Sequence, residues 1–288
     1  MRLIDAHVHL QPHGEQPPVD RARIERYVEQ ARANGLDGIV ITEHLFRFRE
    51  AYALLAGWWN AEPNPQLRAA TAAYWQDHVN LSLPEYVRLI EAAKRDRLPV
   101  SLGLELDWIP GHAEELRALL APYAWDVVLG SVHWLGGFGI DQEAMLDEWE
   151  ARDVDAVFAE YGQLLTDLAG AGLADVLAHP DLPKLFGHAP RDLAGFQGQI
   201  VAAAVRGGCA LEINTNGLNK PVHDLYPAPS LLRAACQAGV PITFGSDAHQ
   251  PERLGEHFDA AIAVARQAGY GSYARFRKRR VYVQRLVD

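Results

Sequence analysis

Short apolar runs recur along the chain, and each of them ends in polar residues. The runs are rich in Val, Ile and Leu, are too short for helices, and follow Gly, Pro or Asp. They cover residues 3–9, 38–44, 100–107, 127–133, 176–179, 210–216 and 242–249. Because apolar residues are nearly continuous in them, we expect strands that are covered on both faces, as in a parallel sheet.

Amphipathic stretches separate these runs and predict helices. They cover residues 20–34, 83–97, 112–120, 144–170, 193–206, 229–238 and 252–268. Several end at a Gly, which is typical of a helix C-terminus. Seven alternations of strand and helix predict a parallel α/β fold, and no repeat or low-complexity linker divides residues 1–288 into more than one domain.

One connection, residues 45–81, is much longer than the others and carries seven aromatic residues. Two interpretations fit it. The segment can be an additional helical hairpin whose aromatic side chains pack on the rim of the fold. It can also be a lid over the active site, since long structured loops are often functional.

Polar residues that can bind metals or substrates gather at the C-terminal ends of the predicted strands. In a parallel barrel these ends converge on one face, where active sites of such folds lie. The sequence therefore predicts one site built from separate strands. Its candidate residues are His7, His9, Glu43, His44, Glu105, His133, His179, Asn214, Asp247 and His249.

The spacing of these residues favours metal binding. His7 and His9 are two residues apart on a strand, so that both imidazoles point to the same side. Taken alone, the pair could also be a buried, hydrogen-bonded pair of histidines. Asp247 and His249 repeat this two-residue spacing. Glu105 ends an apolar run, and a carboxylate buried there must be paired with another group or bind a metal. Six histidines and two carboxylates predict two or three divalent ions, and the mixed ligands favour Zn, Mn or Fe.

Composition and charge exclude several classes of binding partner. The 288 residues carry a formal net charge of −10 with 12 histidines, which argues against a nucleic-acid or anionic-membrane surface. No apolar run reaches the roughly 18 residues of a membrane span, no secretory segment is recognisable, and the two cysteines suggest no disulfide framework. We expect a cytoplasmic protein. A basic run at 275–280 is interpreted as a solvated terminal segment.

Paired metals predict phosphoester hydrolysis. Two ions about 3.5 to 4 Å apart hold a bridging hydroxide as nucleophile and neutralise the phosphate oxygens. Cationic loop residues would add further positive charge for the phosphate, and Arg49 is one candidate. We expect substrate contacts from Arg47, Lys184, Asn214 and Lys220.

Six motifs in this order resemble the polymerase and histidinol phosphatase (PHP) superfamily. They are residues 5–9 (DAHVH), 42–44 (TEH), 103–105 (GLE), 130–133 (GSVH), 179–182 (HPDL) and 245–249 (GSDAH). Residues 211–218 (LEINTNGL) with 225–227 (LYP) are similar to the monofunctional histidinol-phosphate phosphatases within it. One departure is Asn219, which precedes Lys220 where that group usually has Arg.

The resemblance implies a distorted (β/α)7 barrel and a trinuclear site that hydrolyses L-histidinol phosphate to L-histidinol and phosphate in histidine biosynthesis. It also implies catalytic roles for Glu105, Asp247 and His249. The implied ligands are His7, His9, Glu105 and Asp247 for the first ion, Glu105, His133 and His179 for the second, and His44, His249 and Glu15 for the third, with His13 as the alternative to Glu15.

The sequence is compatible with other functions. The enzyme could act on another small phosphate ester or a nucleotide, as Asn219 suggests, or the chain could be an inactive metal-binding module. The proton for the leaving group could come from water, Asp247, Glu43 or a histidine. The sequence gives no oligomeric state.

Overall fold

A computed structural model describes residues 3–12 and 14–286 of the chain. Seven parallel strands form one sheet in the order β1-β2-β3-β4-β7-β8-β9. They are β1 (Ile4–Val8), β2 (Gly38–Ile41), β3 (Val100–Asp107), β4 (Val127–Ser131), β7 (Val176–Leu177), β8 (Ala210–Asn214) and β9 (Ile242–Gly245). The N–H of His9 donates to the carbonyl of Ala248 at 2.9 Å, which joins the two edges. The sheet is therefore a nearly closed barrel, and the predicted (β/α)7 architecture is confirmed.

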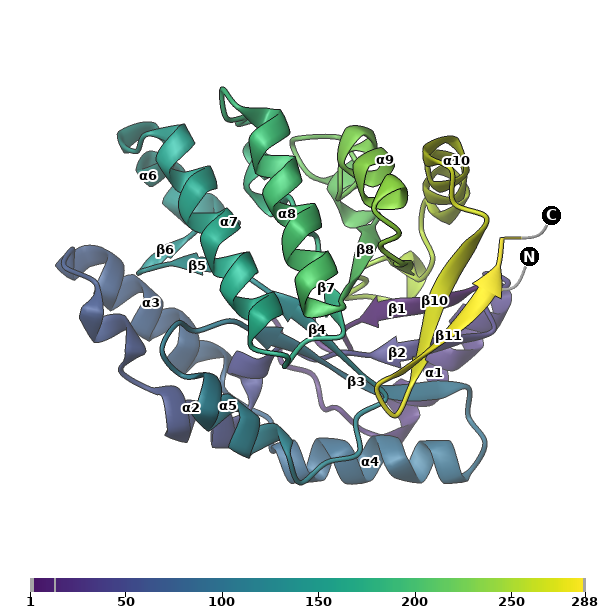
Figure 1. Ribbon diagram of the computed structural model, residues 1–288. Helices are drawn as coiled ribbons and strands as arrows, with labels where there is room; N and C mark the ends of the chain where they lie inside the picture. Colours follow the sequence, from purple (N-terminus) through teal and green to yellow (C-terminus); the bar gives the residue numbers. More distant parts are fainter. Residues whose placement is uncertain (1–2, 13, 287–288) are drawn as a thin grey trace.

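Helices surround the barrel on its outside (Figure 1). They are α1 (Arg21–Ala33), α4 (Leu83–Arg95), α5 (Ala113–Leu120), α7 (Val154–Gly170), α8 (Leu193–Gly207), α9 (Pro229–Gln237) and α10 (Phe258–Ala268). Three of them begin at an Asp whose carboxylate accepts a hydrogen bond from a first-turn N–H: Asp20, Asp153 and Asp192. Local capping thus fixes where these helices start.

Two predicted helices have different bounds in the structure. The stretch 144–170 is divided into a 3-10 helix (Glu143–Met145), α6 (Leu146–Ala151) and α7, because Arg152 is extended and Asp153 caps a new helix. The stretch 252–268 contains only a 3-10 helix (Pro251–Arg253) before α10. Gly255 and His257 have left-handed backbones with φ of 66° and 62°, which an α-helix cannot continue through.

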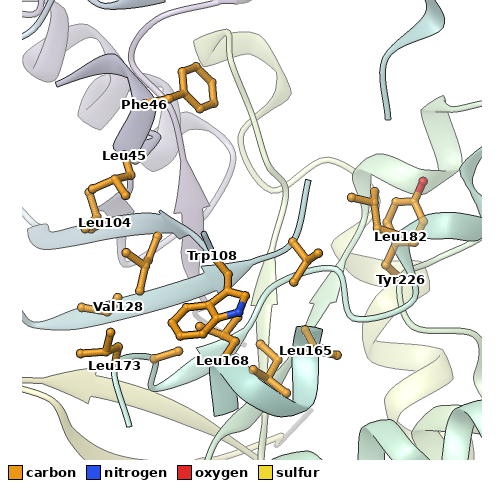
Figure 2. Packing of buried hydrophobic residues seen from close by; sticks show 14 of the residues in the cluster. Leu45, Phe46, Leu104, Trp108, Val128, Leu165, Leu168, Leu173, Leu182 and Tyr226 are labelled. Carbon is orange, nitrogen blue, oxygen red and sulfur yellow. The ribbon is translucent and has the colours of Figure 1, made fainter. Parts of the chain in front are cut away.

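Side chains from adjacent elements fill the space between the sheet and its helices. Figure 2 shows Leu104 of β3 and Val128 of β4 in the same packed cluster as Leu165 and Leu168 of α7. All four are fully buried. Burial of this kind contributes about 1.5 to 3 kcal/mol per large apolar side chain, and it holds the strand ends in fixed positions.

The segment 45–81 lies at the end of the barrel to which the strands point (Figure 1). It contains 3-10 helices (Leu45–Arg47 and Trp58–Ala61), α2 (Arg49–Leu55) and α3 (Pro65–His78). Its aromatic rings surround Trp134 of the hairpin formed by β5 (Trp134–Leu135) and β6 (Phe138–Gly139). The ring of Trp134 lies 5.6 Å from Phe46 and 5.7 Å from Trp75, centroid to centroid.

The opposite end of the barrel is covered by a hairpin of β10 (Ser272–Arg277) and β11 (Arg280–Arg285). The basic run 275–280 comprises the end of β10, the turn at Lys278 and Arg279, and the first residue of β11. Asp126 holds the turn, because its Oδ1 accepts from the N–H of Lys278 at 3.2 Å and its carbonyl accepts from the N–H of Arg279 at 2.9 Å. Among the described residues, no helix is long and apolar enough to cross a membrane.

Candidate metal centre

His7 of β1 and His9, just beyond it, point to the same side of the strand. Their Nε2 atoms lie only 3.0 Å apart. Oε2 of Glu105, near the end of β3, lies 3.3 and 3.4 Å from these two nitrogens. Oδ1 of Asp247, beyond the end of β9, lies 3.7 and 3.4 Å from them. Two imidazoles and two carboxylates therefore surround one point.

Glu105 also faces a second group of histidines. Its Oε1 lies 3.0 Å from Nε2 of His179 and 3.4 Å from Nε2 of His133. Its Oε2 is 2.6 Å from Nδ1 of His44. A single buried carboxylate thus reaches five imidazoles that come from β1, β2, β4 and β7 or the residues after them.

A third group consists of His9, His44 and His249, whose ligand atoms all lie within 4.8 Å of one another. The ring of His9 stacks on each of the other two with a centroid distance of 4.2 Å, and the rings of His44 and His249 are 5.8 Å apart. Glu15, the predicted third ligand of this ion, is exposed, and the metal-capable groups of the described chain do not include it. The alternative, His13, lies outside the described residues.

The donor set fits divalent cations. Nδ1 of His9 and Nδ1 of His179 are buried and have no hydrogen-bond partner within the described chain. Such atoms are costly unless a partner or a metal satisfies them. Four overlapping groups of described residues could each hold an ion: His7, His9 and Glu105; Glu105, His133 and His179; His9, His44 and His249; and His44, Asp107 and His133.

The electrostatics of the cluster favour the ionised form of Glu105. Burial tends to raise the pKa of Glu105, but His44, His7 and His133 lower it well below its ordinary range. Burial likewise opposes the charge on His133, yet Glu105 and Asp107 raise its pKa to about 10. These mutual attractions act without a cation, and a bound cation would compete with the protons for the same nitrogens.

Two buried carboxylates outside the predicted set orient the histidines. Oε1 of Glu212 is 2.7 Å from Nδ1 of His7, and Oδ1 of Asp107 is 2.7 Å from Nδ1 of His133. Each bond leaves the Nε2 atom of the ring facing the cluster, which is how second carboxylates position metal-binding histidines. Our sequence reasoning missed both. Their signal was a buried acid two residues from a predicted site residue on the same strand, Asp107 after Glu105 and Glu212 before Asn214.

The backbone is strained where two site residues leave their strands. His179 has φ of 28° and Asp247 has φ of 53°, which non-glycine residues adopt rarely and often at functional sites. At position 245 a glycine is needed for a different reason, because there is no room for a side chain. A Cβ there would lie 2.0 Å from Oε1 of Glu212 and 2.6 Å from Cβ of His7. A larger residue at 245 would displace the carboxylate that orients His7.

A narrow cavity opens over the cluster. Its lining residues are His44, Glu105, His133, Asp141, His179, Leu182, Leu185, Asn216, Lys220, Tyr226, Asp247 and His249. Lys220, a predicted substrate contact, is the only Lys or Arg among these described residues. Asp141, Asn216 and Tyr226 were not singled out as site residues, because the sequence does not show which loop residues turn inward.

The other three predicted substrate contacts are not among the lining residues. Arg47 is buried and donates to Gln11 Oε1 at 3.1 Å and to the carbonyl of Pro12 at 3.2 Å. Lys184 donates to Asp224 at 2.8 Å and pairs with Asp181 at 3.1 Å. Asn214 is buried and donates to Glu212 at 3.2 Å. Their polar atoms stabilise the loops around the site.

Comparison with known proteins connects this geometry to a family. The profile of the PHP domain matches residues 9–216. A Deinococcus radiodurans protein named "Probable histidinol-phosphatase" is 36% identical over 282 residues, covering 97% of this chain and 98% of that protein. The histidinol-phosphatase of Bacillus subtilis is 27% identical and covers 91% of this chain and 99% of its own length.

Solved structures share the fold. The histidinol phosphate phosphatase of Lactococcus lactis, crystallised with zinc, L-histidinol and phosphate, matches with a TM-score of 0.71 at 22% identity, covering 98% of this chain and 99% of that one. A second structure, from Listeria monocytogenes, matches with a TM-score of 0.72 at 21% identity, covering 89% and 99%. At these identities the likeness concerns the barrel and its strand order.

Proposed function

This chain belongs to the PHP domain family, and we propose that it is a metal-dependent phosphomonoesterase that hydrolyses L-histidinol phosphate to L-histidinol and phosphate. The observation that carries the proposal is the position of Glu105, whose two oxygens face separate histidine groups at 3.0 to 3.4 Å. The relative from Deinococcus radiodurans, similar over nearly its whole length, supports the choice of substrate.

The ligand scheme follows from the three groups of side chains. His7, His9, Glu105 and Asp247 would hold one ion, and Glu105, His133 and His179 a second. His44 and His249 would hold a third together with His9 or with a residue of the loop after β1. Imidazoles mixed with carboxylates suit Zn, Mn or Fe. When bound, such ions supply Lewis-acid charge that activates water and stabilises phosphate oxygens.

The protein's own residues would perform the remaining tasks. Glu212 and Asp107 hold His7 and His133 in the tautomer that presents Nε2 to the cluster. Lys220 supplies a cation at the cavity that can donate to a phosphate oxygen. Leu182, Leu185 and Tyr226 form an apolar wall that limits water around the organic part of the substrate. A cytoplasmic location stays a prediction.

The direct test is phosphate release from a panel of esters by enzyme reloaded with Mn, Zn or Fe. The panel contains L-histidinol phosphate, nucleoside monophosphates and sugar phosphates. We expect kcat/KM for histidinol phosphate to exceed the others by at least about tenfold. A smaller preference would overturn the substrate assignment, and no turnover of any ester by fully metallated protein would indicate a binding module.

The Glu105→Ala variant tests the ligand scheme. We expect it to lose turnover and the retention of two ions, because Glu105 is common to two groups. Glu29→Ala, on the exposed side of α1, is the matched control and should keep both turnover and metal content. Full metal content and activity in Glu105→Ala would contradict the scheme.

We also propose that segment 45–81 is a fixed rim. Phe46 supports this, because its ring stacks on His44 at 4.6 Å and contacts Trp134 at 5.6 Å, so the segment packs directly behind a proposed ligand. Hydrogen exchange of the amides in α3 tests the proposal. Protection that is unchanged by phosphate and L-histidinol is expected; strong new protection on binding would indicate a lid instead.

A further inference from the structure

Asp141 is a carboxylate in the cavity that the metal scheme does not use. Three acidic residues line the cavity, and two of them, Glu105 and Asp247, face the clustered histidines. The third, Asp141, is half-buried and belongs to none of the metal-capable groups of the described chain. Within that part of the chain it also has no hydrogen bond or ion pair. Its charge is therefore available to a bound molecule.

The loop that carries Asp141 is held firmly in place. The N–H of the preceding residue, Ile140, donates to the carbonyl of His133 at 3.0 Å, and its carbonyl accepts from the indole of Trp149 at 3.0 Å. Both Ile140 and Trp149 are buried. The position of Asp141 is thus tied to the strand end that presents His133, so its distance from the cluster is fixed by the fold.

A free carboxylate is unfavourable in a cavity that binds phosphate. It repels the substrate's negative charge, and its desolvation by a bound molecule costs free energy. Its field reaches across the cavity, because Asp141 contributes to raising the pKa of His133 and of Tyr226. The cost is offset if the bound molecule brings a positive charge to this position.

The other lining residues offer different kinds of contact in different parts of the cavity. Lys220 provides a cation for phosphate, and Leu182 with Leu185 provides an apolar surface. The hydroxyl of Tyr226 is buried and has no hydrogen-bond partner within the described chain, so it too is available to a ligand. A molecule that satisfies all of these carries a phosphate, an apolar or flat body and a cationic group.

We propose that Asp141 binds the ammonium group of the substrate and makes the enzyme selective for phosphate esters of amino alcohols. The inference rests on the proposed function and adds the residue that recognises the amine. An ammonium-to-carboxylate hydrogen bond is among the stronger polar contacts, and leaving either partner unpaired where the ligand excludes water is costly.

The test compares L-histidinol phosphate with its analogue that lacks the amine, 3-(imidazol-4-yl)propyl phosphate. In Asp141→Asn we expect kcat/KM for histidinol phosphate to fall about 10- to 100-fold, while that for the analogue changes less than about threefold. Metal content and melting temperature should match the wild type. Asp147→Asn, exposed on the neighbouring α6, is the control and should leave both substrates unaffected.

Two results would overturn the inference. An equal fall for both substrates would mean that Asp141 acts on the phosphate chemistry or the metals, and no fall for either would mean that it does not contact the substrate. If the wild type prefers an ester other than histidinol phosphate, the proposed function fails separately. Asp141 is then tested with 2-aminoethyl phosphate against ethyl phosphate, and an unchanged ratio in Asp141→Asn rejects the amine contact.

Discussion

Glu212 joins two of the proposed metal ligands, His7 and His179. One carboxylate oxygen, Oε1, lies 2.7 Å from Nδ1 of His7. The other, Oε2, accepts a hydrogen bond from the N–H of His179 at 2.8 Å. The same side chain thus orients an imidazole and fixes the strained backbone of a second strand end. Glu212 is fully buried, so bulk water does not compete for these hydrogen bonds.

Glu212→Gln should therefore weaken metal binding without removing a ligand. We expect a 10- to 100-fold loss of metal affinity or activity, on the order seen when second carboxylates are removed. The loss of metal affinity is measured by competition with a chelator and by metal analysis of the dialysed protein. Glu29→Gln serves as the control. Wild-type affinity in Glu212→Gln would show that the carboxylate has no role in the metal centre.

The exposed position of Glu15 gives a prediction about the third ion. His9, His44 and His249 already supply three nitrogens within 4.8 Å. We expect Glu15→Ala to retain the full metal content of the wild type, since three imidazoles can hold a divalent ion without it. Metal analysis of Glu15→Ala beside His13→Ala decides it. Loss of one ion in Glu15→Ala alone would restore the ligand that the sequence favoured.

Asp126 links the barrel to the C-terminal hairpin, far from the metal centre. Its Oδ2 accepts from Lys94 at 2.6 Å and from the N–H of Leu102 at 3.0 Å, and its Oδ1 accepts from Lys278. Asp126→Ala leaves these donors without their acceptor, which we expect to lower the free energy of unfolding by about 1 to 3 kcal/mol.

Urea unfolding at equal metal loading measures that change. The exposed Asp96, which pairs with Arg21 on the surface, provides the control Asp96→Ala and should change stability less. Metal content should be the same in both variants. A stability of Asp126→Ala equal to that of the wild type would show that the hairpin is not held through this residue.

The two cysteines should differ sharply in reactivity. Burial raises the pKa of Cys209 to about 11, so at pH 7.5 only about one part in three thousand is thiolate. Cys236 is partly exposed. We expect iodoacetamide to label one thiol in the native protein and two after denaturation. Labelling of Cys209 should rise with pH only toward pH 11, and rapid labelling at neutral pH would contradict its burial.

Local patterns in the sequence determined the strands and the end of each strand that carries the site. The two-residue period of a strand places His7 and His9 on one side, and parallel strand ends meet on one face whatever the loops do. These facts depend only on neighbours along the chain. The strands, and the histidines at their ends, could therefore be predicted from the sequence.

Tertiary structure alone decided which charges serve the site. Lys184 pairs with Asp224, 40 residues away, and Glu212 contacts His7, 205 residues away. The sequence suggested Arg47 as a substrate contact, but residues of the loop after β1 accept its hydrogen bonds. Nothing in the sequence indicated that Asp141 lines the cavity. Such pairings depend on how loops fold over a closed barrel, because a cation whose N–H donors are taken up by partners within the protein is no longer placed to donate to the substrate.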